Sequence, residues 1–268
     1  MKKLSARRRH PLAALVVLLL ALAATGGLYA TLAPGEAKAD DSAQSLAIEE
    51  GKRLYDVGCA TCHGSNGQGT SDGPSLSGVG AAAVDFQVGT GRMPLQQPGP
   101  QAEVKPEVYS QEEIDQLAAY IASLGPGPTV PEESQYDPAG GDPAQGGELF
   151  RTNCSQCHNF SGQGGALTHG KEAPNLHDVD PRHIYEAMLT GPQNMPSFPN
   201  TVLTEEDKQD IIAYLNEVNT SSSAHPGGLS LGGYGPVGEG LFAWIGGLSA
   251  LVACAVWIGA RSTKARKS

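Results

Sequence analysis

Two copies of one short motif place the strongest constraint on this chain of 268 residues. The copies are Cys59-Ala60-Thr61-Cys62-His63 and Cys154-Ser155-Gln156-Cys157-His158. The pattern C-x-x-C-H is the attachment signal for c-type haem. Its spacing lets each thiol bond to one vinyl group of haem while the next imidazole reaches the iron as proximal ligand. The sequence therefore predicts two covalently bound haem c groups, attached through Cys59, Cys62, Cys154 and Cys157, with His63 and His158 as axial ligands.

Other chemistry is open to a C-x-x-C pair, which can bind zinc or form a disulfide outside the cytoplasm. Haem is favoured because both copies end in His and because the region around them has few large side chains for a core. Residues 40–219 contain ten aromatic residues and no Trp. The fifth cysteine, Cys254, lies in an apolar run and is interpreted as a small packing residue.

The two motifs belong to an internal repeat. Gly51, Leu54 and Tyr55 precede the first motif at the same distances as their counterparts, Gly146, Leu149 and Phe150, precede the second. Each half is expected to contain a short helix before the motif, a Gly-rich loop and a last helix. The last helices start at Ser110 and Thr204 with an acidic residue three positions later, as in a capping box. Their expected buried faces are formed by Ile114, Leu117, Ile121 and Leu124, and by Ile211, Ile212, Leu215 and Val218. The predicted fold class is all-α, with two tandem domains of one fold.

A second axial ligand for each iron is predicted at Met93 and Met195, which occupy matching positions before the last helix of each half. A neutral thioether ligand raises the haem potential. The third interior methionine, Met188, is interpreted as packing. His169, His177 and His183 are weaker candidates for displacing Met195, because none has a counterpart in the first half. The carbonyl groups of Pro74 and Pro174 are expected to accept a hydrogen bond from the outer nitrogen of each proximal imidazole.

Both ends of the chain contain apolar runs long enough to span a bilayer as a helix. Residues 11–35 and 240–260 contain no charged side chain. Trp244 and Trp257 lie 13 residues apart, which suits opposite membrane interfaces. The second run is predicted to be a transmembrane helix. The first fits either a secretory signal with a cleavage site at Ala37-Lys38-Ala39 or a retained anchor, and the retained anchor is favoured.

The charges of the chain are unevenly distributed. Nine of the 18 basic residues lie before residue 10 or after residue 260, so the interior carries nine against 28 acids and a formal charge near −19. Such an interior repels phosphates, which excludes nucleic-acid binding. The basic flanks predict that both termini are cytoplasmic, if the first run is retained, and that the haem domains lie on the other side of the membrane.

These observations divide the chain into seven segments. The predicted segments are 1–39, a basic start and signal or anchor; 40–125, the first domain; 126–141, a Pro- and Gly-rich linker; 142–219, the second domain; 220–238, a flexible tether; 239–260, the transmembrane helix; and 261–268, a basic cytoplasmic tail.

Each half resembles a class I cytochrome c in its leading helix, C-x-x-C-H motif, proline loop, axial Met and last helix. The layout of the whole chain is similar to the dihaem cytochrome cc subunit of menaquinol-oxidising cytochrome bc complexes. That resemblance implies assembly with cytochrome b and Rieske iron–sulfur subunits and a supercomplex with a terminal haem-copper oxidase. It implies that the chain carries single electrons from the Rieske protein to that oxidase. The resemblance does not identify which residues of this chain contact partners, because only the haem motifs and the layout match.

The leading interpretation is thus an electron-carrying subunit of a quinol–cytochrome c oxidoreductase that performs no substrate chemistry itself. Alternatives are a dihaem electron-transfer subunit of another respiratory oxidase or dehydrogenase, and a dihaem peroxidase. A peroxidase or a gas sensor needs an open iron site, which the paired methionines oppose.

Overall fold

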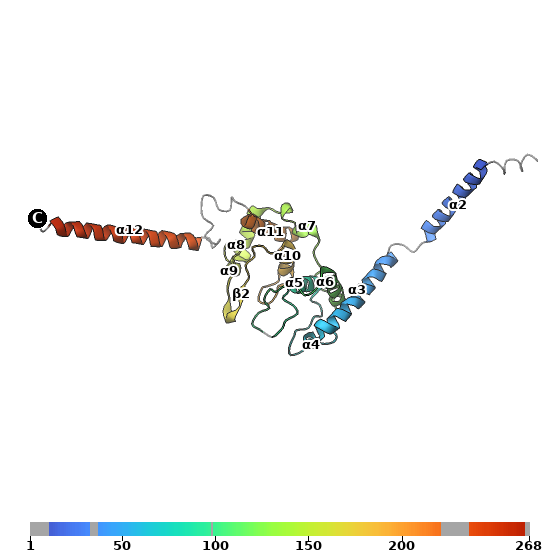
Figure 1. Ribbon diagram of the computed structural model, residues 1–268, viewed down its shortest axis with the longest axis horizontal. Coiled ribbons are helices and arrows are strands. Elements are labelled where there is room, and N and C mark those ends of the chain that lie inside the picture. Colours follow the sequence, from blue (N-terminus) through green and yellow to red (C-terminus); the bar gives the residue numbers. More distant parts are fainter. Residues whose placement is uncertain (1–10, 33–36, 98, 221–235, 266–268) are drawn as a thin grey trace, which may run out of the picture. The chain divides into compact units, whose positions relative to one another are not determined.

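The computed structural model describes residues 11–32, 37–97, 99–220 and 236–265. The predicted basic start before residue 11, residues 221–235 of the predicted tether and the end of the tail from residue 266 lie outside the described residues. The chain divides into two compact units, Met1–Ala47 and Ile48–Ser268. The regular secondary structure is almost entirely helical, and the main helices follow one another in the same order in both halves (Figure 1).

Four helices form the first half. They are α3 (Ala37–Gly58), α4 (Ala60–His63), α5 (Ala81–Gly89) and α6 (Gln111–Ser123). The core lies between α3, α5 and α6, and its fully buried members include Tyr55, Ile114 and Leu117. Leu124 of the expected buried face is only partly buried.

The second half repeats this arrangement with four helices and a small hairpin. Its elements are α8 (Pro143–Asn153), α9 (Ser155–His158), β1 (Gly165–Ala166), η2 (Thr168–Gly170), β2 (Glu172–Ala173), α10 (Pro181–Thr190) and α11 (Glu205–Thr220). Ile211, Ile212 and Leu215 are buried in its core as predicted, whereas Val218 of the expected buried face is only partly buried. Phe150 is buried there as well, and so is Met188, which is 2% exposed. The sequence contains two cytochrome c domains of all-α fold, and the two-residue strands do not change that class.

In both halves the leading helix crosses the last helix at a glycine. A Cβ atom added at Gly51 would overlap the backbone carbonyl of Gln116, and one added at Gly146 would overlap that of Asp210. The backbones approach so closely that no larger residue fits without moving one helix. The repeat of Gly51 and Gly146 in the sequence therefore marks the helix crossing of each domain.

Both predicted capping boxes are present. The Ser110 hydroxyl accepts a bond from Glu113 N, and the Glu113 carboxylate accepts one from Ser110 N at 2.8 Å. Thr204 and Asp207 make the same pair, at 3.1 and 2.8 Å. These reciprocal bonds satisfy backbone donors that the first turn of a helix leaves unpaired.

Replacing Ser110 with alanine is expected to lower the free energy of unfolding by about 1 kcal/mol, because Glu113 N loses its acceptor. Thermal denaturation of the haem-loaded chain measures this loss. The control, Ser110→Thr, keeps the hydroxyl and should stay within a few tenths of the parent. Equal stability of the alanine variant and the parent would contradict the role of this cap.

The structure differs from the sequence analysis in three places. The helix before the first motif, α3, has 22 residues and is not short. Helix α5 occupies part of the expected Gly-rich loop, where the run Ala81-Ala82-Ala83 favours a helix start. The linker 126–141 is more structured than a spacer, since it contains α7 (Glu133–Tyr136) and η1 (Pro138–Gly140), which pack against α11.

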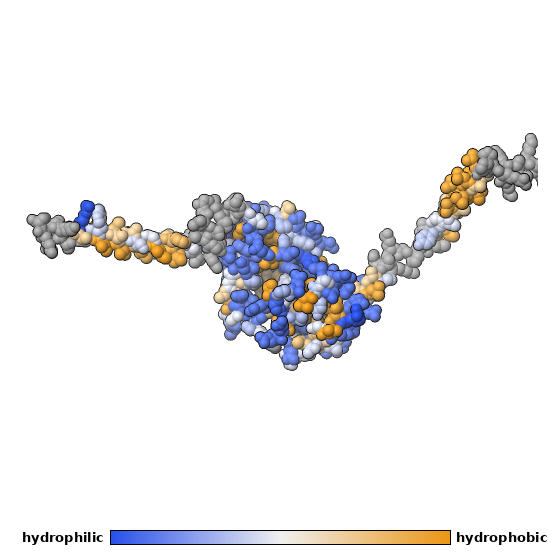
Figure 2. Space-filling model, viewed as in Figure 1, coloured by the Kyte–Doolittle hydropathy of each residue, from blue (hydrophilic) through white to orange (hydrophobic). Residues whose placement is uncertain are grey.

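Two further helices, α2 (Pro11–Leu32) and α12 (Pro236–Ala265), are long and apolar enough to cross a membrane. Their most apolar windows, Leu12–Tyr29 and Gly240–Arg261, have mean hydropathies of 2.3 and 2.1 and are not buried. Both helices are largely coloured as hydrophobic (Figure 2). A helix of 22 residues is about 33 Å long, which matches the hydrocarbon thickness of a bilayer.

Candidate haem attachment sites

Each C-x-x-C-H motif forms a tight helical turn that begins at its first cysteine. In the first motif, the Cys59 carbonyl accepts bonds from Cys62 N at 3.2 Å and His63 N at 3.0 Å. In the second, the Cys154 carbonyl accepts bonds from Cys157 N at 3.1 Å and His158 N at 2.9 Å. The turn brings both thiols and the imidazole of each motif together, as attachment of haem c requires.

A single hydrogen bond orients each proximal histidine. His63 Nδ1 lies 2.8 Å from the Pro74 carbonyl oxygen, and His158 Nδ1 lies 3.0 Å from that of Pro174. A carbonyl oxygen can only accept, so Nδ1 carries the proton and the lone pair of Nε2 is free for a metal. The expectation for Pro74 and Pro174 is confirmed. Burial lowers the pKa of His158, which keeps its imidazole neutral as a ligand must be.

The loops after the two motifs share the same backbone hydrogen bonds. Gly69 N donates to the His63 carbonyl at 2.8 Å, and Gly164 N donates to that of His158 at 2.9 Å. Further along, Leu76 N donates a hydrogen bond of 2.7 Å to the Gly67 carbonyl, and Leu176 N donates one of the same length to the Gly162 carbonyl. The two loops therefore place each proline carbonyl beside its histidine with the same backbone hydrogen bonds, although their sequences differ.

Burial perturbs the first thiol of each motif. It raises the pKa of Cys59 to about 11, with a smaller contribution from Cys62, and that of Cys154 to about 11, with a smaller contribution from Cys157. Both thiols are therefore protonated until a partner binds them, since a bound metal would itself remove the proton. The five cysteines, all within the described ranges, are free thiols in this structure.

A cavity of about 480 Å³ adjoins the second motif, a volume typical of cofactor sites. Its lining in the second domain includes Cys154, Cys157, His158, Pro174 and Met195. The cavity thus brings the predicted thiols and both predicted axial ligands of this half to one space. Met93 is partly buried and packs against the core cluster of the first half, to which Tyr55 and Cys59 also belong.

The first domain supplies part of the wall of this cavity. Its contribution includes the side chains of Phe86, Arg92, Val104 and Lys105. The Arg92 guanidinium lies over the Phe86 ring at 4.7 Å, and burial lowers its pKa. Lys105 Nζ donates to the Pro94 carbonyl at 2.9 Å. The lining also contains the acids Glu107, Glu172, Asp178 and Asp180, so its charges are mixed and do not identify the occupant. The thiols, the neutral imidazole and the size of the cavity fit haem c.

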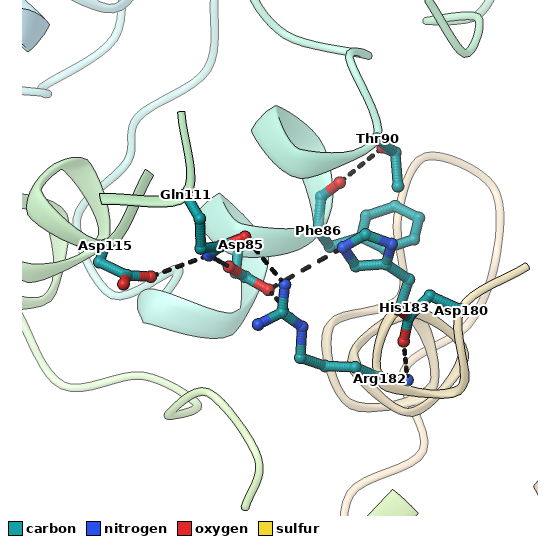
Figure 3. A network of polar contacts seen from close by, with 8 residues as sticks. All are labelled: Asp85, Phe86, Thr90, Gln111, Asp115, Asp180, Arg182 and His183. Carbon is teal, nitrogen blue, oxygen red and sulfur yellow. Dashed lines mark hydrogen bonds and ion pairs between the residues drawn. The ribbon is translucent and has the colours of Figure 1, made fainter. Parts of the chain in front are cut away.

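The three weaker histidine candidates lie in different surroundings. His169 is exposed in η2, where its φ is 59°. His177 Nε2 lies 2.7 Å from the Ser161 carbonyl. His183 points from α10 toward Asp85 of α5, with 4.0 Å between Nε2 and Oδ2 (Figure 3).

The contact between the two domains was not predicted from the sequence. Helices α5 and α10 are counterparts in the repeat and pack against each other. Across this contact Arg182 Nε lies 3.2 Å from Asp85 Oδ2, and Gln193 exchanges two hydrogen bonds with the backbone of Ala102 at 3.2 and 3.1 Å. Single charged residues inside otherwise ordinary helices form no motif, so no pattern in the sequence predicts this interface.

Comparison with known proteins agrees with this geometry. Residues 48–125 match the family described as "Cytochrome c", and residues 141–215 match "Cytochrome C oxidase, cbb3-type, subunit III". The fold and the sites thus define a protein with two cytochrome c domains, a class that binds haem c covalently.

Relatives along nearly the whole chain identify the family. The "Cytochrome bc1 complex cytochrome c subunit" of Mycobacterium tuberculosis is 48% identical, over 96% of this chain and 93% of the relative. The protein of the same name in Corynebacterium efficiens is 46% identical, over 97% and 94%. A "Cbb3-type cytochrome c oxidase subunit FixP" of Bradyrhizobium diazoefficiens is 30% identical over about half of each chain, 52% and 48%. The chain belongs to the family of cytochrome c subunits of the cytochrome bc1 complex.

Proposed function

We propose that this chain is the membrane-anchored dihaem electron carrier of a quinol-oxidising cytochrome bc1 complex. In this role it assembles with cytochrome b and Rieske iron–sulfur subunits, and it carries single electrons from the Rieske protein to a terminal haem-copper oxidase in the same supercomplex. The near full-length identity to cytochrome bc1 complex cytochrome c subunits carries the proposal.

Each domain holds its cofactor with an equivalent set of side chains. Cys59 and Cys62 attach one haem c, and Cys154 and Cys157 attach the other. The iron ligands are His63 and Met93 in the first domain, and His158 and Met195 in the second. When bound, haem c supplies a one-electron iron couple whose potential the axial ligands set. The buried apolar walls of the cavity keep water from this couple.

The two apolar helices fix the carrier beside its partners. We place both termini in the cytoplasm and the haem domains on the opposite side of a bacterial plasma membrane, with α2 retained as an anchor. The Arg261 guanidinium lies 4.4 Å from the centre of the Trp257 ring at one end of α12, a pairing suited to a membrane interface. Attachment at both ends raises the effective concentration of the domains near fixed partners.

Affinity purification of the tagged chain from its own membranes in a mild detergent tests the proposed partners. Cytochrome b, a Rieske protein and a haem-copper oxidase are expected to co-purify. Adding quinol under anaerobic conditions should convert the haem c groups to their reduced form, and admitting oxygen should reoxidise them. The haem absorbance spectrum follows both changes. Recovery with a dehydrogenase and no Rieske protein would overturn the proposal.

The reduced protein is expected to bind almost no carbon monoxide, because a methionine occupies the sixth position of each iron. Difference spectra recorded with and without the gas measure the bound fraction. A Met195→Ala variant serves as positive control, since it opens one iron and should bind about one carbon monoxide per chain. Stoichiometric binding by the parent protein would show an open site and favour substrate chemistry.

A further inference from the structure

Three side chains with metal-binding atoms meet at the contact between α5 and α10. They are Asp85 of the first domain and His183 and Glu186 of the second, and one ligand atom of each lies within 4.8 Å of the others. One of them, His183, also lines the cavity beside the second motif. Asp85 and Glu186 are 0% exposed, and the His183 side chain is 14% exposed. A Cβ atom added at Gly89 would lie 3.1 Å from His183 Nε2, so this glycine leaves room for the imidazole beside α5.

The atoms that face one another in this cluster lack hydrogen-bond partners. Within the described ranges, both carboxylate oxygens of Glu186, Oδ2 of Asp85 and Nε2 of His183 have no hydrogen-bond partner. Buried carboxylates are costly unless a hydrogen bond or an opposite charge compensates them. Arg182 approaches Asp85 Oδ2 at 3.2 Å as an ion pair, with a geometry that makes no hydrogen bond. Burial, with a smaller contribution from Asp85, raises the pKa of Glu186 to about 10, so without a bound cation this carboxyl group holds a proton. A cation that binds here takes the place of that proton.

A second layer of polar groups holds Asp85 in place (Figure 3). Gln111 Nε2 donates to Asp85 Oδ1 at 2.9 Å and lies the same distance, 2.9 Å, from Asp115 Oδ1. Arg182 Nη2 in turn donates to Gln111 Oε1 at 3.1 Å. Carboxylates that bind metals are commonly fixed in this way by hydrogen bonds to their other oxygen.

We propose that Asp85, His183 and Glu186 bind one divalent transition-metal ion, with zinc as the probe, at the interface of the two domains. One imidazole nitrogen and two carboxylate oxygens form a ligand set that zinc accepts, and water can complete a tetrahedron. The ion takes the place of the proton that Glu186 otherwise holds. Because the ligands come from both domains, it fastens the first domain to the second at their shared surface.

Zinc analysis of the full-length, haem-loaded protein in detergent tests this site. The protein is treated with a chelator to remove bound metal and is then dialysed against zinc. Mass spectrometry measures the zinc content, and the haem iron content gives the amount of protein to which it is compared. We expect about one tightly held zinc in the parent protein. Asp85→Asn, His183→Asn and Glu186→Gln should each lose it. Gln111→Ala, which frees Asp85 Oδ1, should weaken binding roughly 10–100-fold.

His169→Asn is the matched control, because His169 is exposed in the same domain and lies outside the cluster. It should retain zinc at the parent level. Haem absorbance and circular dichroism confirm that each variant is folded. Added zinc should also raise the melting temperature of the parent but not that of Glu186→Gln, because binding stabilises only a folded site.

X-ray absorption at the zinc edge distinguishes this site from a cysteine site. Nitrogen and oxygen neighbours at about 2.0–2.2 Å are expected, whereas sulfur at about 2.3 Å would place the metal on cysteine and overturn the proposal. Equal zinc retention by the parent and Glu186→Gln would overturn it as well. So would a carboxylic-acid infrared band that persists in zinc and disappears in Glu186→Gln, since a proton would then occupy the place of the ion.

Discussion

Replacing Met93 or Met195 with alanine is expected to lower the reduction potential of one haem centre while both haems stay attached. The thioether stabilises ferrous iron, and water or an open position in its place does so less well. The shift should be on the order of a tenth of a volt or more, within the ~0.8 V that axial ligands span. Spectroelectrochemical titration of the purified chain resolves the two centres, and each substitution should move only one of them.

Met188→Leu is the matched control for these titrations. Met188 is buried in the core of the second domain and is the remaining interior methionine. A substitution that conserves its volume should cost less than about 1.5 kcal/mol of stability and leave both potentials near their parent values. If Met93→Ala and Met195→Ala left the potentials unchanged while Met188→Leu moved one, the ligand assignment would be wrong.

Replacing Gly146 with alanine is expected to destabilise the second domain by about 2–3 kcal/mol, near the upper end of the usual cost of overpacking. The added methyl group would overlap the backbone of Asp210, and a backbone carbonyl cannot rotate away as a flexible side chain can. Helix α11 must therefore shift against α8. Denaturant unfolding of the haem-loaded chain, followed by circular dichroism, measures the loss.

Gly51→Ala should have the same effect in the first domain, where the methyl group would meet the carbonyl of Gln116. Gly99→Ala is the control, because its nearest contact, Gln101 O at 3.6 Å, is an ordinary one. If Gly51→Ala and Gly146→Ala were both as stable as the parent, the helices would be able to move apart at little cost. That result would contradict the close packing of the helices.

The repeat explains how much of the fold the sequence predicts. The motif, the capping boxes and the glycine at each helix crossing depend on contacts between residues whose spacing is preserved in both halves. A feature predicted in one half can therefore be checked at the equivalent position of the other half. Tyr55 and Phe150 are buried at equivalent positions for this reason.

The sequence does not predict a helix whose two copies differ in sequence, or contacts between the domains that occur only once. Helix α5 was missed because its sequence, with one buried Asp and Ala at its start, differs from that of α10. The ion pair between Asp85 and Arg182 joins residues 97 positions apart in different domains, with no counterpart in the repeat. Such contacts depend on how two finished domains dock, which helical periodicity within each domain does not specify. The axial role of Met93 and Met195 stays a prediction.

The cavity beside the second motif gives the two halves unequal roles despite their common plan. Phe86, Arg92 and Val104 close that cavity from the first domain. The electrostatic environment of the second centre is thus partly encoded some 60 residues upstream of its own cysteines. A second domain expressed alone would present its cofactor to water on that side. The reduction potential measured on the isolated second domain would then differ from the potential of the same centre in the tandem chain.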